Sequence, residues 1–314
     1  MRYAIISDIH GNNPALQLVI EDALAQGAQE FLFAGDYCVS APWPAEVWET
    51  LHSMKNARII CGNEEQYLRV PEGEDGQFEI SRWCKQALSP EQRDWFFGLP
   101  NRVDLHSEGW DIHMSHSSEE FIGGAEVKHF NVSWLRETHP EDRVDRAVLL
   151  QEIREGLEAS QDFAETLSVL PKGIYIFGHT HMQWHMQLKD HIFINPGSCG
   201  LPLDGGECGA PYTLLAIEGG QVTVEERRVL YDVHELIRRV RTSDQYTKAR
   251  VWSEVIFREW LTVKDKMLMF LRFVEQYARG IGDMRRPFAK DTWEAAYEEW
   301  RKKNELISAQ GTIL

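Results

Sequence analysis

Short apolar runs alternate with amphipathic segments along the first 230 residues of the chain. Runs rich in β-branched and aromatic residues predict strands, and apolar positions with a spacing of three or four predict helices. This alternation is typical of a layered α/β sheet protein. The predicted elements are strands at 3–7, 30–34 and 57–61, helices at 14–26, 43–54 and 81–97, strands near 102–106 and 109–115, a charged helix around 145–167, and strands near 174–177, 182–188, 191–195, 211–217 and 222–229 that complete a second sheet.

The pattern changes after Tyr231, where long helical patterns cover 233–241, 251–277 and 292–303. Their apolar positions recur at helical spacing and form a face that must be buried. We therefore divide the chain into residues 1–230 and a helical C-terminal extension, 231–314. Packing of the extension onto the first unit is the favoured prediction, because so short a segment rarely supports its own core. Association with a second chain through these helices is the alternative.

The composition narrows the class of protein. The formal net charge of −16 argues against nonspecific binding of nucleic acid, which needs clustered lysine and arginine. No run of 18 apolar residues could span a membrane, and the first residues enter a predicted strand directly, without the features of an export signal. The five cysteines have neither an even count nor a metal-binding spacing, so reduced thiols and a cytoplasmic location are expected.

Side chains that commonly bind metals follow the predicted strands. Asp8 and His10 end the first strand, and alternate residues of an extended chain share a face. Because the carboxyl ends of strands meet at one edge of an α/β sheet, these side chains are expected to converge there. The sequence therefore predicts a metal site. Its candidate ligands are Asp8, His10, Asp36, Asn63, His116, His179 and His181.

The order of these motifs resembles that of the calcineurin-like metallophosphoesterases, and of their short bacterial and archaeal phosphodiesterase branch in particular. Asp8-Ile9-His10-Gly11-Asn12 and Asn195-Pro196-Gly197-Ser198 carry the second likeness, which covers roughly residues 1–229. The resemblance implies a four-layer α/β/β/α sandwich, here with a helical C-terminal extension.

The resemblance also implies two divalent transition-metal ions. Asp36 would bridge them, because two close cations need a shared anionic oxygen, and a metal-bridged hydroxide would attack phosphorus. Mixed nitrogen and oxygen ligands suit manganese, iron, zinc or nickel. Asp36, Asn63 and His10 would serve catalysis as well as metal binding. One metal would be held by Asp8, His10, Asp36 and His181, and the other by Asp36, Asn63, His116 and His179.

Two positions depart from the family pattern. His116 is followed by Ser117 where glycine is usual, and His113 is a competing ligand. Glu64 stands where many relatives have a histidine that protonates the leaving oxygen. Adjacent cations would keep a carboxyl ionised, so Glu64 is a poor acid, and starting a short helix is an equally good explanation. Substrates whose leaving group needs little protonation should therefore react best.

Three further features have both a functional and a structural interpretation. Residues 117–170 could form a lid over the metals or be a solvated insertion. Tyr37 and Trp43 could line the cleft and stack on a base, although aromatic residues more often serve packing. Ser198 more often belongs to a turn than to a site.

The predicted function is hydrolysis of a phosphodiester or phosphoanhydride in a small phosphorylated or nucleotide-like substrate, such as a dinucleoside polyphosphate. A phosphomonoesterase or a protein phosphatase is the alternative within the family. A scaffold that keeps the fold and the metal but not the catalysis is the alternative outside enzymes.

Overall fold

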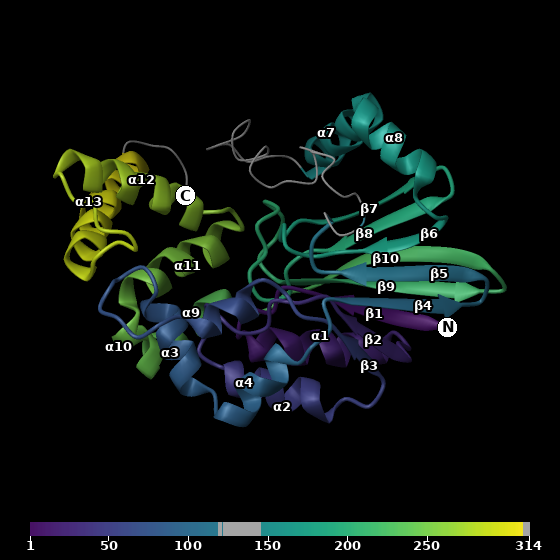
Figure 1. Cartoon of the computed structure of the whole chain (residues 1–314), viewed down its shortest axis with the longest axis horizontal. Helices are drawn as coiled ribbons and strands as arrows, with labels where there is room; N and C mark the ends of the chain where they lie inside the picture. The colour runs from purple at the N-terminus through teal and green to yellow at the C-terminus, as the bar shows by residue number, and fades with distance from the viewer. Residues whose placement is uncertain (119–120, 122–145, 310–314) are drawn as a thin grey trace.

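A computed structural model of the chain describes residues 1–118, 121 and 146–309. Two five-stranded sheets lie face to face at its centre (Figure 1). The first sheet has the order β10-β9-β1-β2-β3, in which β1 pairs in parallel with β2 and antiparallel with β9. Its strands are β1 (Arg2–Ile6), β2 (Glu30–Phe33), β3 (Ala57–Ile59), β9 (Ala210–Glu218) and β10 (Gln221–Val229).

The second sheet has the order β4-β5-β6-β8-β7. Its strands are β4 (Arg102–Ser107), β5 (Trp110–Ser115), β6 (Gly173–Ile176), β7 (Gln183–Leu188) and β8 (His191–Pro196). The assignment of 211–217 and 222–229 to this sheet was wrong. Those strands are β9 and β10, and β9 returns antiparallel along β1 in the first sheet.

Alternate residues of the strands build the core between the sheets. Ile5 of β1 and Leu32 of β2 are fully buried against Ile112, Ile174 and Ile194 of the second sheet. The neighbouring residues of the same strands point to the other side, because successive side chains of a strand alternate. Each sheet therefore has a second apolar face that needs a cover.

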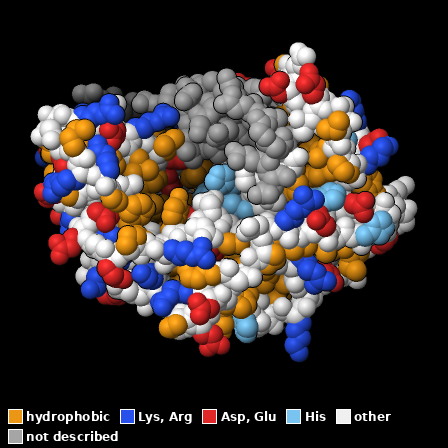
Figure 2. Space-filling model, viewed as in Figure 1, with side chains coloured by type: hydrophobic (Ala, Val, Ile, Leu, Met, Phe, Trp, Pro, Cys, Tyr) orange, Lys and Arg blue, Asp and Glu red, His pale blue; other side chains and the backbone are white. Residues whose placement is uncertain are grey.

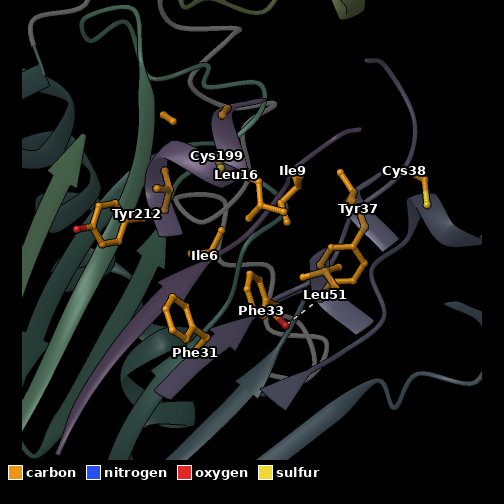
Figure 3. Packing of buried hydrophobic residues seen from close by; sticks show 14 of the residues in the cluster. Ile6, Ile9, Leu16, Phe31, Phe33, Tyr37, Cys38, Leu51, Cys199 and Tyr212 are labelled. Carbon is orange, nitrogen blue, oxygen red and sulfur yellow. Dashed lines mark hydrogen bonds between the residues drawn. The ribbon is translucent and has the colours of Figure 1, made fainter. Parts of the chain in front are cut away.

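Helices supply that cover and form the outer layers. On the first sheet lie α1 (Asn13–Ala25) and α2 (Pro44–Ser53), and Figure 3 shows Leu16 of α1 beside Ile9 in this layer. Helices α7 (Arg146–Ala159) and α8 (Gln161–Val169) bury Ile153 and Phe163 on the second sheet. The four-layer α/β/β/α order is thus confirmed.

Several predicted helices are divided in two. The prediction over 81–97 becomes α3 (Glu79–Ala87) and α4 (Pro90–Phe97), because Ser89 forms a capping box before Pro90. Ser160 caps α8, because its side chain accepts from the Phe163 amide. Before these helices along the chain, the 3₁₀ helix η1 (Glu64–Arg69) follows β3. Capping serines thus start new helices within segments whose apolar spacing predicts one continuous helix.

The C-terminal extension consists of α9 (Val233–Arg241), α10 (Asp244–Lys248), α11 (Arg250–Thr262), α12 (Met267–Gly280) and α13 (Lys290–Ala309). Val263 adopts the left-handed conformation and separates α11 from α12 within the predicted helix 251–277. Trp260 and Ile256 of α11 share a core with Ala41 and Leu201 of the sandwich, so the extension packs on the same chain. Within the described residues, every helix is too short or too polar to cross a membrane.

Candidate metal centre

The candidate ligands lie just beyond the ends of five strands, at one edge of the sandwich. Asp8 and His10 follow β1, Asp36 follows β2, and the remaining ligands follow β3, β5 and β6. Five of the seven have φ values between 52° and 68°, a region that costs a non-glycine residue about 1–3 kcal/mol. Such strain persists where surrounding contacts enforce it, and it concentrates at functional sites. The five residues are Asp8, His10, Asp36, His179 and His181.

Backbone hydrogen bonds hold these loops together. The Asp8 amide donates to the Gly35 carbonyl at 2.9 Å, and the His10 amide donates to the Asp36 carbonyl at 3.0 Å. The Asp8 carbonyl accepts from the Ser198 hydroxyl at 2.6 Å. Ser198 also accepts from the Leu201 amide at 2.8 Å, so its role here is the structural one of a turn.

One cluster contains Asp8, His10 and His181, whose potential ligand atoms all lie within 4.8 Å of one another. The Nε2 atoms of His10 and His181 are 3.0 Å apart. Nε2 of His181 lies 3.4 Å from Oδ1 of Asp8. Two imidazole nitrogens and a carboxylate oxygen therefore face a common point.

A second cluster contains Asp36, His116 and His179, again within 4.8 Å. Nε2 of His116 is 3.2 Å from Oδ2 of Asp36 and 3.0 Å from Oδ1 of Asn63. Asp36 also belongs to a third group with His10 and Glu64. Asp36 of the second cluster is thus also close to His10 of the first, and the family resemblance implies that Asp36 would bridge two ions.

The ring nitrogens that face away from the clusters are held by carbonyl oxygens. Nδ1 of His116 lies 2.6 Å from the Ala34 carbonyl, and Nδ1 of His181 lies 2.7 Å from the Leu201 carbonyl. A carbonyl can only accept, so it fixes the proton on Nδ1 and leaves the Nε2 lone pair for a cation. Most metal-binding histidines have such an outer partner. The residues therefore fit divalent metal ions of the type that the sequence predicts.

The centre also stabilises positive charge. Burial lowers the pKa of His10 and His116, yet the carboxylates of Glu64 and Asp36 outweigh it and raise both pKa values to about 10. Burial raises the pKa of Asp8 to about 6. Burial also acts to raise the pKa of Asp36, but the charge of His116 lowers it below its usual value. A cation that replaces these imidazole protons would meet the same attraction.

His116 and His113 are separated by the sheet. Nδ1 of His113 contacts Asp104 at 2.5 Å, and its ring stacks on Tyr175 at 4.8 Å in the outer layer. His113 is outside both clusters. The structure places His116, rather than its competitor, beside Asp36.

The two aromatic residues suggested for the cleft serve packing. Tyr37 is completely buried, and its hydroxyl donates to the Phe33 carbonyl at 3.0 Å (Figure 3). Trp43 lies under the guanidinium of Arg239 at 4.7 Å, between the loop after β2 and the extension. Tyr37 has no exposed surface on which a base could stack.

Glu64 and Glu65 have different roles. Glu64 begins η1, as one of its two interpretations predicts, and its carboxylate also contacts Nδ1 of His10 at 2.8 Å. Glu65 is fully buried, and it accepts hydrogen bonds from the backbone amides of Asp36, Tyr37 and Gly62 at 2.7–3.2 Å. Sequence reasoning missed Glu65, although an acid directly after Asn63-Glu64 was visible. Its carboxylate ties the Asp36 loop to the Asn63 loop.

The extension reaches the same loops, a contact that the sequence did not reveal. The indole N–H of Trp260 donates to the Gly200 carbonyl at 2.8 Å, and the Gly200 amide donates to the Asp8 carbonyl at 3.0 Å. Figure 2 shows histidine side chains in a hollow of this face, bordered by hydrophobic side chains. The question of a lid concerns mainly 119–120 and 122–145, which lie outside the described residues.

Comparisons with known proteins agree with this architecture. The family model of the calcineurin-like phosphoesterase superfamily domain matches residues 1–219. A metallophosphoesterase structure from Sphaerobacter thermophilus is 20% identical, with a TM-score of 0.57 over 84% of this chain and 100% of that one. A hypothetical protein from Pyrococcus horikoshii OT3 is 15% identical, with a TM-score of 0.54 over 81% and 97%. A search of curated proteins finds no match.

Proposed function

This chain belongs to the calcineurin-like phosphoesterase superfamily, and from that premise we propose that it is a metal-dependent hydrolase of phosphodiesters or phosphoanhydrides. The observation that carries the proposal is the pair of ligand clusters, which a third group containing both His10 and Asp36 connects. Both clusters combine imidazole nitrogen with carboxylate oxygen, the donor set of manganese, iron, zinc or nickel. Two such ions, when bound, supply Lewis-acid activation of water and of the phosphoryl group.

The chain's own residues would orient the reactants. Asp8, His10 and His181 would hold one ion, and His116, His179 and Asn63 the other, with Asp36 between them. Fixed Nδ1 contacts to the Ala34 and Leu201 carbonyls keep two of these rings in place without substrate. Such preorganisation lowers the cost of reaching the transition state.

Glu64 favours a good leaving group. Burial raises the pKa of its carboxyl, but the nearby His10 acts to lower it, and adjacent metal ions would lower it further. Glu64 is then ionised and cannot donate a proton. Aryl, nucleotide or polyphosphate leaving groups depart without one, so we propose a nucleotide-type diester or anhydride ahead of an alkyl monoester.

The location and partners are part of the same proposal. Five free cysteines support a cytoplasmic location, since four are buried and the fifth is half-buried. The substrate would be a small phosphorylated molecule. We propose that the C-terminal helices pack on their own chain rather than bind a second copy, because their apolar face already contacts the sandwich.

The test is hydrolysis by metal-stripped protein refilled with manganese. The substrates are bis-p-nitrophenyl phosphate, p-nitrophenyl phosphate and diadenosine tetraphosphate. Asp36→Asn should lose roughly a thousandfold in rate, because a bridging charge worth several kcal/mol is removed. His113→Gln is the matched control and should keep the wild-type rate.

The outcomes separate the candidate functions. A faster diester or anhydride reaction supports the proposal, and a faster monoester reaction favours the phosphomonoesterase. Wild-type protein that binds manganese but turns over none of the three substrates favours the scaffold. Equal rates for Asp36→Asn and the wild type would contradict the metal-dependent mechanism.

A further inference from the structure

Tyr67 is a large aromatic residue that remains exposed beside the metal centre. Its side chain keeps 45% of its surface accessible, whereas most aromatic residues of the sandwich are buried. Among the described residues, its hydroxyl makes no hydrogen bond. An aromatic ring in this position stabilises the fold little, so its place requires another explanation.

The geometry of η1 directs Tyr67 toward the centre. Residues three apart in a 3₁₀ helix lie almost directly above one another, so Tyr67 lies over Glu64. Glu64 contacts His10 of the first ligand cluster. Burial raises the pKa of the Tyr67 phenol, and the carboxylates of Glu64 and Asp36 raise it further, which agrees with this proximity.

A second ring completes an aromatic surface. The ring of Phe78 lies 6.5 Å from that of Tyr67, at an angle of 43°, and is itself only half-buried. The Phe78 amide donates to Asp75 at 2.8 Å, and Asp75 is paired with Arg82 at 2.7 Å. The backbone that carries the Phe78 ring is therefore fixed without a ligand.

The C-terminal extension supports the same segment. The amide of Gly76 donates to the Phe288 carbonyl at 3.0 Å, and the Phe288 amide donates to the Gln77 side chain at 3.2 Å. Rigid aromatic rings give contact area at low entropic cost. The segment before α3 thus presents the Phe78 ring from a fixed backbone, next to the exposed ring of Tyr67.

From this arrangement we infer that Tyr67, with Phe78, is a stacking surface for the planar leaving group of the substrate. It determines specificity for a nucleobase or another aromatic group attached to the reacting phosphate. The inference rests on the proposed function and narrows its substrate class. Stacking of one base on an aromatic side chain changes affinity by about 5- to 100-fold when the ring is removed.

The experiment measures binding, so it does not depend on turnover. Calorimetry on the manganese-loaded protein compares adenosine 5′-monophosphate with ribose 5-phosphate, which lacks the base. The wild type should prefer the nucleotide. Tyr67→Ala should reduce this preference by about 5- to 100-fold, and Tyr67→Phe should keep it. Tyr277→Ala is the matched control, because Tyr277 forms a similar pair with Phe273 at 6.5 Å on α12.

The measured affinities distinguish stacking on the Tyr67 ring, a contact through the Tyr67 hydroxyl, and no role of Tyr67 in base binding. An equal preference in the wild type and Tyr67→Ala overturns the inference, and so does a wild type without preference. An equal loss in Tyr67→Phe and Tyr67→Ala also overturns it, because the hydroxyl would then be the important group. Failure of the proposed function is distinguishable, since it appears as absent hydrolysis by the wild type and not in these affinities.

Discussion

Trp260→Phe tests whether the C-terminal extension stabilises the metal centre. Trp260 is 2% exposed, and its indole N–H donates to the Gly200 carbonyl at 2.8 Å. Phenylalanine keeps an aromatic ring but has no N–H. The Gly200 carbonyl would retain the amide group of Asn12 at 3.2 Å, so it would not become an unsatisfied acceptor.

Two contributions set the expected loss of stability. The hydrogen bond is worth about 1 kcal/mol, at the middle of the usual range because the acceptor keeps one partner. The smaller ring leaves a space of roughly 40 Å³, which costs about 1 kcal/mol more. The free energy of unfolding should fall by about 2 kcal/mol, and Tm by about 3 °C for a chain of 314 residues.

The same substitution should weaken metal binding. The Gly200 amide donates to the Asp8 carbonyl, so a less constrained Gly200 gives Asp8 more freedom. If the hydrogen-bond energy appears in metal affinity, the manganese Kd rises about fivefold. Thermal unfolding and calorimetric titration with manganese measure the two effects.

Trp293→Phe is the control. Trp293 is equally buried in the extension, and its ring packs against Phe270 at 4.8 Å. It should lose only the packing contribution, about 1 kcal/mol, and bind manganese as the wild type does. The reasoning would be refuted if Trp260→Phe kept the wild-type affinity and lost no more stability than Trp293→Phe.

Two further predictions concern the ligands themselves. Because the pKa values of His10 and His116 are raised to about 10, manganese must displace protons from these rings at neutral pH. For each displaced proton, the manganese affinity should rise about tenfold per pH unit between pH 6 and 8. Calorimetry in buffers of different ionisation enthalpy counts the released protons, and a count of zero contradicts the argument. A Cβ atom at Gly178 would lie 2.5 Å from Oδ2 of Asp8, so Gly178→Ala should abolish tight manganese binding, whereas Gly280→Ala, with open space around its Cβ, should leave it unchanged in the same titration.

The ligand positions could be predicted because they depend on local sequence. An apolar strand that ends in Asp8 and His10 defines both the element and the place where its side chains emerge. The end of a strand is a topological position, so the convergence of five loops follows from the fold class. The start of α1 is local as well, because the side chain of Asn12 accepts from the Ala15 amide at 3.3 Å.

Other features depend on contacts between distant segments. The strands β9 and β10 read as parts of the second sheet because they follow it in the sequence, but the antiparallel pairing of β9 with β1 is decided by the global packing. The burial of Glu65 depends on three backbone amides that approach it only in the folded chain. The periodicity of apolar residues in the sequence does not show that Trp260 donates to the Gly200 carbonyl.

Charge near the proposed metal ions bears on the choice between diester and monoester. Asp8 and Asp36 contribute −2, two divalent ions would contribute +4 and a hydroxide held by them −1, so the centre would carry +1. Glu64, which stands where the family resemblance implies a proton-donating histidine and contacts His10 at 2.8 Å, would lower this to 0. A phosphodiester would add one negative charge to such a centre, whereas a monoester dianion would add two. The net charge of −16 repels both at long range, and more strongly the dianion. Under the proposed function, Glu64 therefore acts against a monoester dianion in two ways, because it supplies no proton to the leaving group and adds negative charge to the centre.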